Sequence, residues 1–301
     1  MSIQIKLEYV NCNLCGSDDA ELLYEAIPLR HNYDKKYNNK FRVVKCRRCG
    51  LVYINPRPDS KSISSYYPES YEYHERRKIS LLEKLYYKCH RFDLGNKKGR
   101  ILDVGCGNGN YLLFLKNSGW DCYGTEMESP MVNYLNENLG LKVYKGELID
   151  IELPKEYFDV ITFWASLEHI PNSLKTIEKA KTLLKPDGKI IIWLQNINSF
   201  EARLFKGYWH HLEIPTHIHQ FSPNTLSELM RKAGLKVEKV RFDISMSFIP
   251  SLEYFLNYHG IKIKINKLFI KILFLPVDFI FILFKTSGLM TIFSVKKENR
   301  R

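Results

Sequence analysis

"ILDVGCGNGN", at residues 101–110, is the stretch that decides the fold. Ile101, Leu102 and Val104 form the short apolar run of a buried strand, and three glycines on alternate positions end it. Residues 111–119 then carry apolar side chains at helical spacing and stop at a glycine. We therefore predict a strand, a glycine turn and a helix, which is the entry unit of a doubly wound α/β sheet.

The charge beside this turn indicates its ligand. A dinucleotide site reads G-x-G-x-x-G and holds a pyrophosphate at the helix N-terminus. Here the spacing is G-x-G-x-G, Asn110 stands at the third glycine position of that pattern, and Asp103 precedes the turn. A carboxylate suits a cationic ligand better, and S-adenosylmethionine (SAM) carries an ammonium and a sulfonium but no phosphate. Glu126 ends the next predicted strand, where an acid can bind both ribose hydroxyls.

These residues resemble the first motifs of class I SAM-dependent methyltransferases. The phrases "ILDVGCGNG", "YFDVITFW…LEHI" and "LLKPDGKIII" stand in the order that this family shows, over about residues 100–243. Strands and helices alternate with short links, which favours a parallel sheet. The resemblance implies a Rossmann-like α/β fold with a seven-stranded sheet. It also implies a SAM site made by Asp103, Gly105, Gly107, Glu126, Met127, Glu147, Leu148 and Trp164.

The second half of the sheet is predicted from three further segments. A helix over 172–188 is expected to be closed by Pro186 and Gly188, and a buried strand follows in "KIIIWLQN". The sixth strand is "KVEKVRF" and the seventh is "LMTIFSVKK". More than forty residues separate these two strands, where the resembled family has a hairpin. We therefore expect a helical insertion at about 245–287.

Two C-x-x-C-G pairs stand near the start of the chain, at Cys12 and Cys15 and at Cys46 and Cys49. Their spacing matches a four-cysteine zinc site. Four sulfur ligands leave no open position, so we predict a structural Zn²⁺ in a ribbon that lacks a core of its own. The alternatives are a site that has lost its metal and thiols that merely lie close together. Three more cysteines are expected to be buried apolar residues: Cys89, Cys106 and Cys122.

These patterns divide the chain into three parts. Residues 1–60 form the predicted zinc ribbon, and a tyrosine-rich helical connector follows over 61–98. Residues 99–301 form the methyltransferase domain. Together with "PTHIHQFS" at 215–222, the ribbon makes the chain similar to zinc-ribbon methyltransferases of bacterial cell-surface sugar and polysaccharide pathways. The resemblance implies an enzyme that acts on a small or glycan-like acceptor.

Histidines gather where an acceptor is expected to bind. His169 follows the fourth strand, at the carboxyl end of the sheet. Four more lie within ten residues in the loop after the fifth strand, at His210, His211, His217 and His219. A hydroxyl acceptor needs a base, and histidine has a suitable pKa, so we predict His169 and His217 as catalytic residues. A second metal site and a purely structural loop are the alternatives.

The insertion contains "LFIKILFLPVDFIFILF" at 268–284, with lysines on both sides. This run is shorter than a spanning helix and contains Lys271, Pro276 and Asp278. Both of its ends also lead back to one sheet edge. Three interpretations remain open for residues 263–285: a lid over the acceptor, a homodimer contact, or an anchor in the interface of the inner membrane face that meets a lipid-linked substrate.

Amino-acid composition limits the possible functions less than these motifs do. The chain has 301 residues and a formal net charge of +12, which permits nucleic acid, an anionic membrane or a phosphate-bearing substrate. The start has no signal-peptide core, and seven cysteines argue against a disulfide framework, so we expect a cytoplasmic protein. Hydroxyl methylation is the leading hypothesis. The alternatives are carbon methylation of a nucleotide-linked deoxysugar, nucleic-acid methylation, which the missing N/D-P-P-Y/F motif disfavours, and a non-enzymatic binding module.

Overall fold

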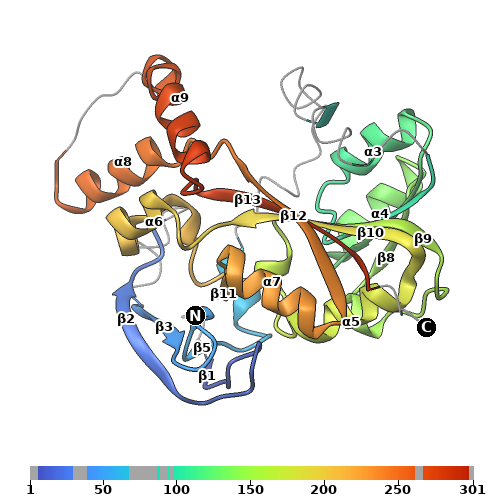
Figure 1. The fold of residues 1–301 in the computed structure, drawn as a ribbon, viewed down its shortest axis with the longest axis horizontal. Helices are drawn as coiled ribbons and strands as arrows, with labels where there is room; N and C mark the ends of the chain where they lie inside the picture. The colour runs from blue at the N-terminus through green and yellow to red at the C-terminus, as the bar shows by residue number, and fades with distance from the viewer. Residues whose placement is uncertain are drawn as a thin grey trace.

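The computed structural model describes residues 6–29, 39–67, 87–88, 94, 98–261 and 267–297. Its main feature is a mixed seven-stranded sheet (Figure 1) with the spatial order β12-β13-β10-β9-β6-β7-β8. The strands are β6 (Arg100–Val104), β7 (Asp121–Glu126), β8 (Lys142–Lys145), β9 (Phe158–Trp164), β10 (Leu184–Gln195), β12 (Leu235–Asp243) and β13 (Leu289–Lys296). β6 to β10 pair in parallel, whereas β13 is antiparallel to both of its neighbours. The predicted seven-stranded α/β fold is confirmed.

Helices cover both faces of this sheet. α3 (Asn110–Asn117) and α4 (Ser129–Glu137) pack on one face, where Leu112, Leu115 and Leu135 join one apolar cluster. α5 (Ser173–Leu183) and α7 (Pro223–Lys232) cover the other face in a second cluster. β9 lies between the two layers, so most of it is buried, and its residues are apolar except for Asp159 and Thr162. Cys106 and Cys122 are buried in the first cluster, as predicted.

The boundary between α5 and β10 differs from the prediction. α5 ends at Leu183, and Pro186 and Gly188 lie inside β10 instead of closing the helix. The pairing of β10 with β9 shifts register between Leu184 and Lys189, so the proline stands where β10 has no partner in β9. A side chain at Gly188 would come within 2.8 Å of the Leu184 side chain. The two residues therefore form a bulge.

A second sheet joins the N-terminal part to the main domain. It contains β2 (Ala20–Ala26), β3 (Phe41–Cys46), β4 (Val52–Ile54) and β11 (His219–Gln220), in the order β11-β4-β3-β2. β11 belongs to the histidine loop and pairs antiparallel with β4. β1 (Leu7–Glu8) pairs with β5 (Arg57–Pro58). Of the predicted connector over 61–98, the structure describes residues 61–67, which include the short helix η2 (Ile63–Tyr66), and 87–88, 94 and 98; Cys89 lies outside the described residues.

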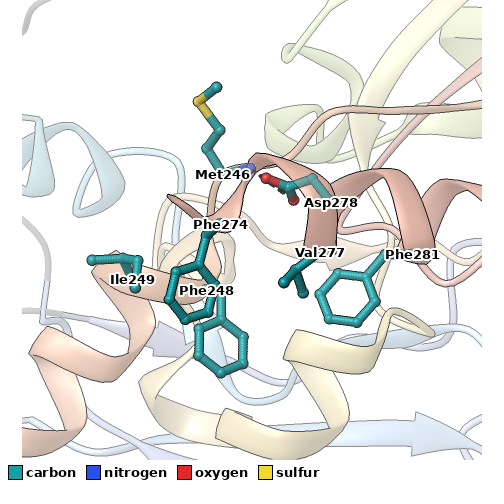
Figure 2. A pocket seen from close by; sticks show the side chains of 7 residues that line it. All are labelled: Met246, Phe248, Ile249, Phe274, Val277, Asp278 and Phe281. Carbon is teal, nitrogen blue, oxygen red and sulfur yellow. Dashed lines mark hydrogen bonds between the residues drawn. The ribbon is translucent and has the colours of Figure 1, made fainter. Parts of the chain in front are cut away.

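The insertion leaves and returns at one sheet edge, as predicted. β12 and β13 pair up to Asp243 and Leu289, and the residues between them contain α8 (Phe248–Tyr258) and α9 (Lys267–Leu283). A groove between the two helices is lined by Met246, Phe248, Ile249, Phe274, Val277, Asp278 and Phe281 (Figure 2). α6 (Phe200–Phe205) contacts α8 from below the groove, and Phe200 stacks on Phe281. Within the described residues, no helix has the length and hydropathy to cross a membrane.

Candidate active site

The glycine turn lies where β6 meets α3, at the carboxyl edge of the sheet. Gly105, Gly107 and Gly109 all have positive φ, of 74°, 52° and 70°. A side chain on Gly105 would stand 2.8 Å from Cβ of Ser166, which follows β9. Only glycine fits this backbone and this close approach. The turn, here called the cradle, lies at the start of α3 and puts no side chain between its backbone and a ligand. The N–H groups of Gly105 and Cys106 donate to Thr125 O, and that of Gly107 donates to Glu126.

Two acidic side chains flank the cradle. Asp103 is 2% exposed and accepts a 2.7 Å hydrogen bond from Thr162 Oγ1. Glu126 accepts hydrogen bonds from the backbone N–H of Gly107 (2.9 Å) and of Met127 (2.7 Å). Burial raises the pKa of Asp103 to about 7, the Thr162 hydrogen bond lowers it, and the charge of Glu126 raises it. The two carboxylates are thus close enough to repel, and a cationic ligand between them is favoured.

The other predicted cofactor residues lie along the same edge. Met127 follows β7 and is 60% exposed. Glu147 is half-buried after β8, and burial raises its pKa, while Leu148 next to it is fully buried. Trp164 ends β9 and contacts the Tyr111 ring at 5.2 Å in a T-shaped arrangement. Because parallel strands end at one edge, these residues all lie along the same edge of the sheet.

Asn110 was not predicted as a site residue. It is the first residue of α3 and is 4% exposed, and its Nδ2 has no hydrogen-bond acceptor among the described residues. A buried donor without an acceptor is costly unless a ligand or water completes it. Asn110 therefore fits a polar ligand that rests on the glycine turn. The signal was its place at the third glycine position of the dinucleotide pattern.

Two of the predicted histidines meet at the same edge. The rings of His169 and His217 are 4.6 Å apart in a T-shaped contact. His169 Nδ1 lies 3.0 Å from Thr216 O and 3.0 Å from the hydroxyl of Tyr67. His217 Nε2 lies 3.3 Å from Glu213 Oε2, and both side chains are less than 9% exposed. The structure therefore joins the two histidines that we predicted to be catalytic, with an acid beside them.

The remaining loop histidines point elsewhere. His219 is buried within β11, and burial, aided by the charge of Arg57, lowers its pKa to about 3, so it stays neutral. His211 Nε2 lies 3.2 Å from Ser245 Oγ, at the start of the insertion. His210 contacts the Tyr254 ring of α8. The cluster of four in the sequence thus contributes one histidine, His217, to the pair.

The four cysteines of the two knuckles converge. Their sulfur atoms all lie within 4.8 Å of one another, with Cys12 Sγ 3.4 Å from Cys49 Sγ and Cys15 Sγ 3.5 Å from Cys46 Sγ. Four sulfurs at 2.3 Å from a tetrahedral zinc ion are separated by about 3.8 Å, so the donor set fits that ion. Asn13, inside the first knuckle, bonds to Pro171 O, Ser173 Oγ and Leu174 N. The knuckle is therefore tied to the start of α5, directly after His169.

A family model described as a methyltransferase domain matches residues 72–240. The ubiquinone biosynthesis O-methyltransferase of Cereibacter sphaeroides is 30% identical over 147 residues, which are 45% of this chain and 60% of that protein. The enzyme of the same name from Actinobacillus pleuropneumoniae is 33% identical over 119 residues, which are 36% of this chain and 48% of that protein. The chain thus spans about half to three fifths of the length of these curated relatives.

Solved structures show the same fold. A SAM-dependent methyltransferase from Archaeoglobus fulgidus has a TM-score of 0.51 and 20% identity, and the match covers 71% of this chain and 93% of that one. The [4+2]-cyclase SpnF also has a TM-score of 0.51, with 17% identity and coverage of 73% and 83%. Because a cyclase shares the fold, the fold alone does not set the reaction.

Proposed function

We propose that this chain, which belongs to the methyltransferase domain family, transfers a methyl group from SAM to a hydroxyl of a small-molecule acceptor. One observation carries the proposal. The edge that holds Asp103, Glu126 and the glycine turn also holds the pair of His169 and His217. This shared edge supports a site for a cationic nucleoside next to one for a proton-losing acceptor. The names of the curated relatives, which are O-methyltransferases, support oxygen as the acceptor atom.

The chain's own residues would bind and align SAM. Asp103 would attract its positive end, and Glu126 would exchange its bonds to Gly107 N and Met127 N for the ribose hydroxyls. Gly105, Gly107 and Asn110 would support the ligand from below, and Glu147, Leu148 and Trp164 would border the adenine. Bound SAM supplies a methyl group that its sulfonium has already activated. The main task of the protein is therefore alignment and removal of the acceptor's proton.

We further propose that the acceptor hydroxyl binds against His169 and His217 and loses its proton there. Tyr67 from the connector reaches His169 at 3.0 Å, so the connector also borders this position. The resemblance to cell-surface sugar enzymes favours a glycan-like acceptor, and the apolar insertion favours one that is linked to a lipid. The four knuckle cysteines would hold a structural Zn²⁺, whose role is to fix the ribbon against the acceptor loop.

The insertion is proposed to rest on the anionic inner face of the membrane. Phe279, Ile280, Leu283 and Phe284 lie on one side of α9 and its end and are 59%, 50%, 77% and 70% exposed. Asp278, the only acid in the sequence between 262 and 287, is 4% exposed, and its carboxylate points toward Met246 (Figure 2), whose backbone N–H donates to it. The outer side therefore presents apolar groups with the cation Lys285 and no acid among its described side chains, as an interfacial helix requires.

Two measurements test the cofactor assignment. Calorimetric titration of SAM is expected to give one site per chain, and Glu126→Gln should weaken binding at least tenfold. Glu128→Gln, next to it but exposed, is the matched control. The acceptor class follows from incubation with labelled SAM and separate lipid, glycan and nucleic-acid fractions. Label in nucleic acid alone, or no heat with SAM, would contradict the proposal.

The membrane contact is tested by flotation with vesicles that contain anionic lipid. The double variant Leu283→Ser and Phe284→Ser should float less than the parent chain. Leu22→Ser and Leu23→Ser, exposed in β2 and remote in sequence from the insertion, serve as the control pair. Equal flotation of both double variants would contradict the proposed membrane contact of the insertion.

A further inference from the structure

A group of metal-ligating side chains lies beside the SAM cradle, apart from the four cysteines. Glu168, His169 and His217 each offer a ligand atom, and these atoms lie within 4.8 Å of one another. Glu168 and His169 belong to a short helical turn after β9, and His217 comes from the loop that precedes β11. The two segments are tied together, since His169 Nδ1 lies 3.0 Å from Thr216 O.

Glu168 needs a partner that the described residues do not supply. Its side chain is 0% exposed, and neither carboxylate oxygen has a hydrogen-bond partner in the described part of the chain. An ionised carboxylate buried in this way is strongly disfavoured unless a cation or hydrogen-bond donors complete it. Glu213 lies nearby, and the two acids repel each other. A buried cation would relieve both costs.

The two histidines are oriented as metal ligands are. His169 Nδ1 lies 3.0 Å from Thr216 O, and His217 Nδ1 lies 3.0 Å from His211 O. A carbonyl oxygen only accepts, so in both rings Nδ1 carries the proton and donates it. The neutral tautomer then has its lone pair on Nε2. At His217 this atom faces Glu213 Oε2 at 3.3 Å, so a metal ion there would take the place of a proton shared with that carboxylate. Metal-binding histidines are fixed in this manner, by a hydrogen bond from the other ring nitrogen to a carbonyl or carboxylate.

We propose that Glu168, His169 and His217 bind a divalent transition-metal ion. Two imidazoles and one carboxylate are a typical ligand set of Zn²⁺ sites that keep a position open for water or substrate. The cysteine site differs, because four sulfurs close the coordination. Glu213, at 3.3 Å from His217 Nε2, adds a second negative charge that favours the ion.

This inference rests on the proposed hydroxyl methylation and gives the acceptor pair a chemical role. The acceptor oxygen would take the open coordination position, where the ion lowers the pKa of the hydroxyl. With both histidines bound to the ion, neither would act as the base, and the proton would pass to the Glu213 carboxylate beside them. The oxygen would then form the C–O bond while the C–S bond of SAM breaks and its electron pair returns to sulfur. The site thus suits acceptors whose hydroxyl can reach a metal ion.

Co²⁺ titration tests the site, because its visible spectrum distinguishes ligand types. The protein is first treated with a mild chelator that leaves zinc in the cysteine site, as metal analysis verifies. We expect one further equivalent of Co²⁺ to bind with the spectrum of nitrogen and oxygen ligands and without sulfur charge-transfer absorption. Glu168→Gln keeps the shape of the side chain and should weaken this binding at least tenfold.

Glu201→Gln is the control, because Glu201 is equally buried in α6 but belongs to a different cluster, with Ser247. It should leave Co²⁺ affinity unchanged. Absence of a nitrogen- and oxygen-type spectrum, or equal Co²⁺ affinity of Glu168→Gln and the parent, would overturn the metal site. SAM calorimetry on the same samples separates the two proposals, since SAM binding without Co²⁺ binding would refute only this one.

Discussion

Asp103 gives the sharpest test of the cofactor site, because its burial opposes stability. Its side chain is 2% exposed, and burial raises its pKa from 3.8 to about 7. The folded chain therefore holds this proton more tightly than the unfolded chain. The contribution of protonated Asp103 to the unfolding free energy is fully present below pH 3.8 and is lost as pH rises to about 7. At about 1.4 kcal/mol per pH unit, the loss amounts to about 4 kcal/mol at neutral pH.

Asp103→Asn removes this loss while it preserves shape. The amide oxygen can still accept the hydrogen bond from Thr162 Oγ1. We expect the variant to be more stable than the parent at pH 8, by up to about 4 kcal/mol. The difference in unfolding free energy should rise by about 1.4 kcal/mol per pH unit between pH 5 and 7 and level off above that range. SAM affinity should fall at least tenfold, because the attraction to the cationic ligand is lost.

Urea unfolding at pH 5, 6, 7 and 8, with SAM calorimetry at pH 8, measures both effects. Asp187→Asn, at an exposed position in β10, controls for the general loss of one negative charge. The reasoning is refuted if Asp103→Asn is less stable than the parent at pH 8. It is also refuted if the difference between the two proteins does not change with pH.

Three further changes test other contacts. Gly105→Ala and Gly260→Ala both place a side chain on backbone with positive φ, but only the new Cβ at position 105 meets a neighbour, at 2.8 Å from Ser166 Cβ. Urea unfolding should therefore show that Gly105→Ala loses about 1–3 kcal/mol more unfolding free energy than Gly260→Ala. Asn13→Ala removes its three contacts to the start of α5 and should cost about 2–3 kcal/mol in urea unfolding, with zinc content unchanged by metal analysis. Cys46→Ser should lose zinc and speed hydrogen exchange at the Ile54 amide, which donates to Ile218 O. Unchanged exchange would show that the metal does not stabilise the histidine loop.

The parts of the fold that follow local patterns were predictable from the sequence. The glycine turn and the strands that flank it are set by a few adjacent residues, so Asp103 and Glu126 could be assigned to one site. The predicted start of β10 was wrong. Proline and glycine, here Pro186 and Gly188, can end a helix or interrupt a strand, and only the pairing of β10 with β9 distinguishes these two cases. The buried state of Glu168 depends on packing around it. No pattern in "WASLEHI" reveals that its carboxylate has no hydrogen-bond partner among the described residues.

The contacts between the ribbon and the two segments that carry His169 and His217 could not be predicted from the sequence either, and they give the ribbon a structural role beside this pair. β11 has two residues, which is too short to predict a strand, yet it extends the ribbon sheet through β4. His217 lies two residues before this strand, and Asn13 of the first knuckle bonds to residues just after His169. Both sides of the histidine pair are therefore held by the ribbon. In the proposed site, the sheet edge alone would fix the SAM side, and the ribbon would supply the rigid support for the acceptor side.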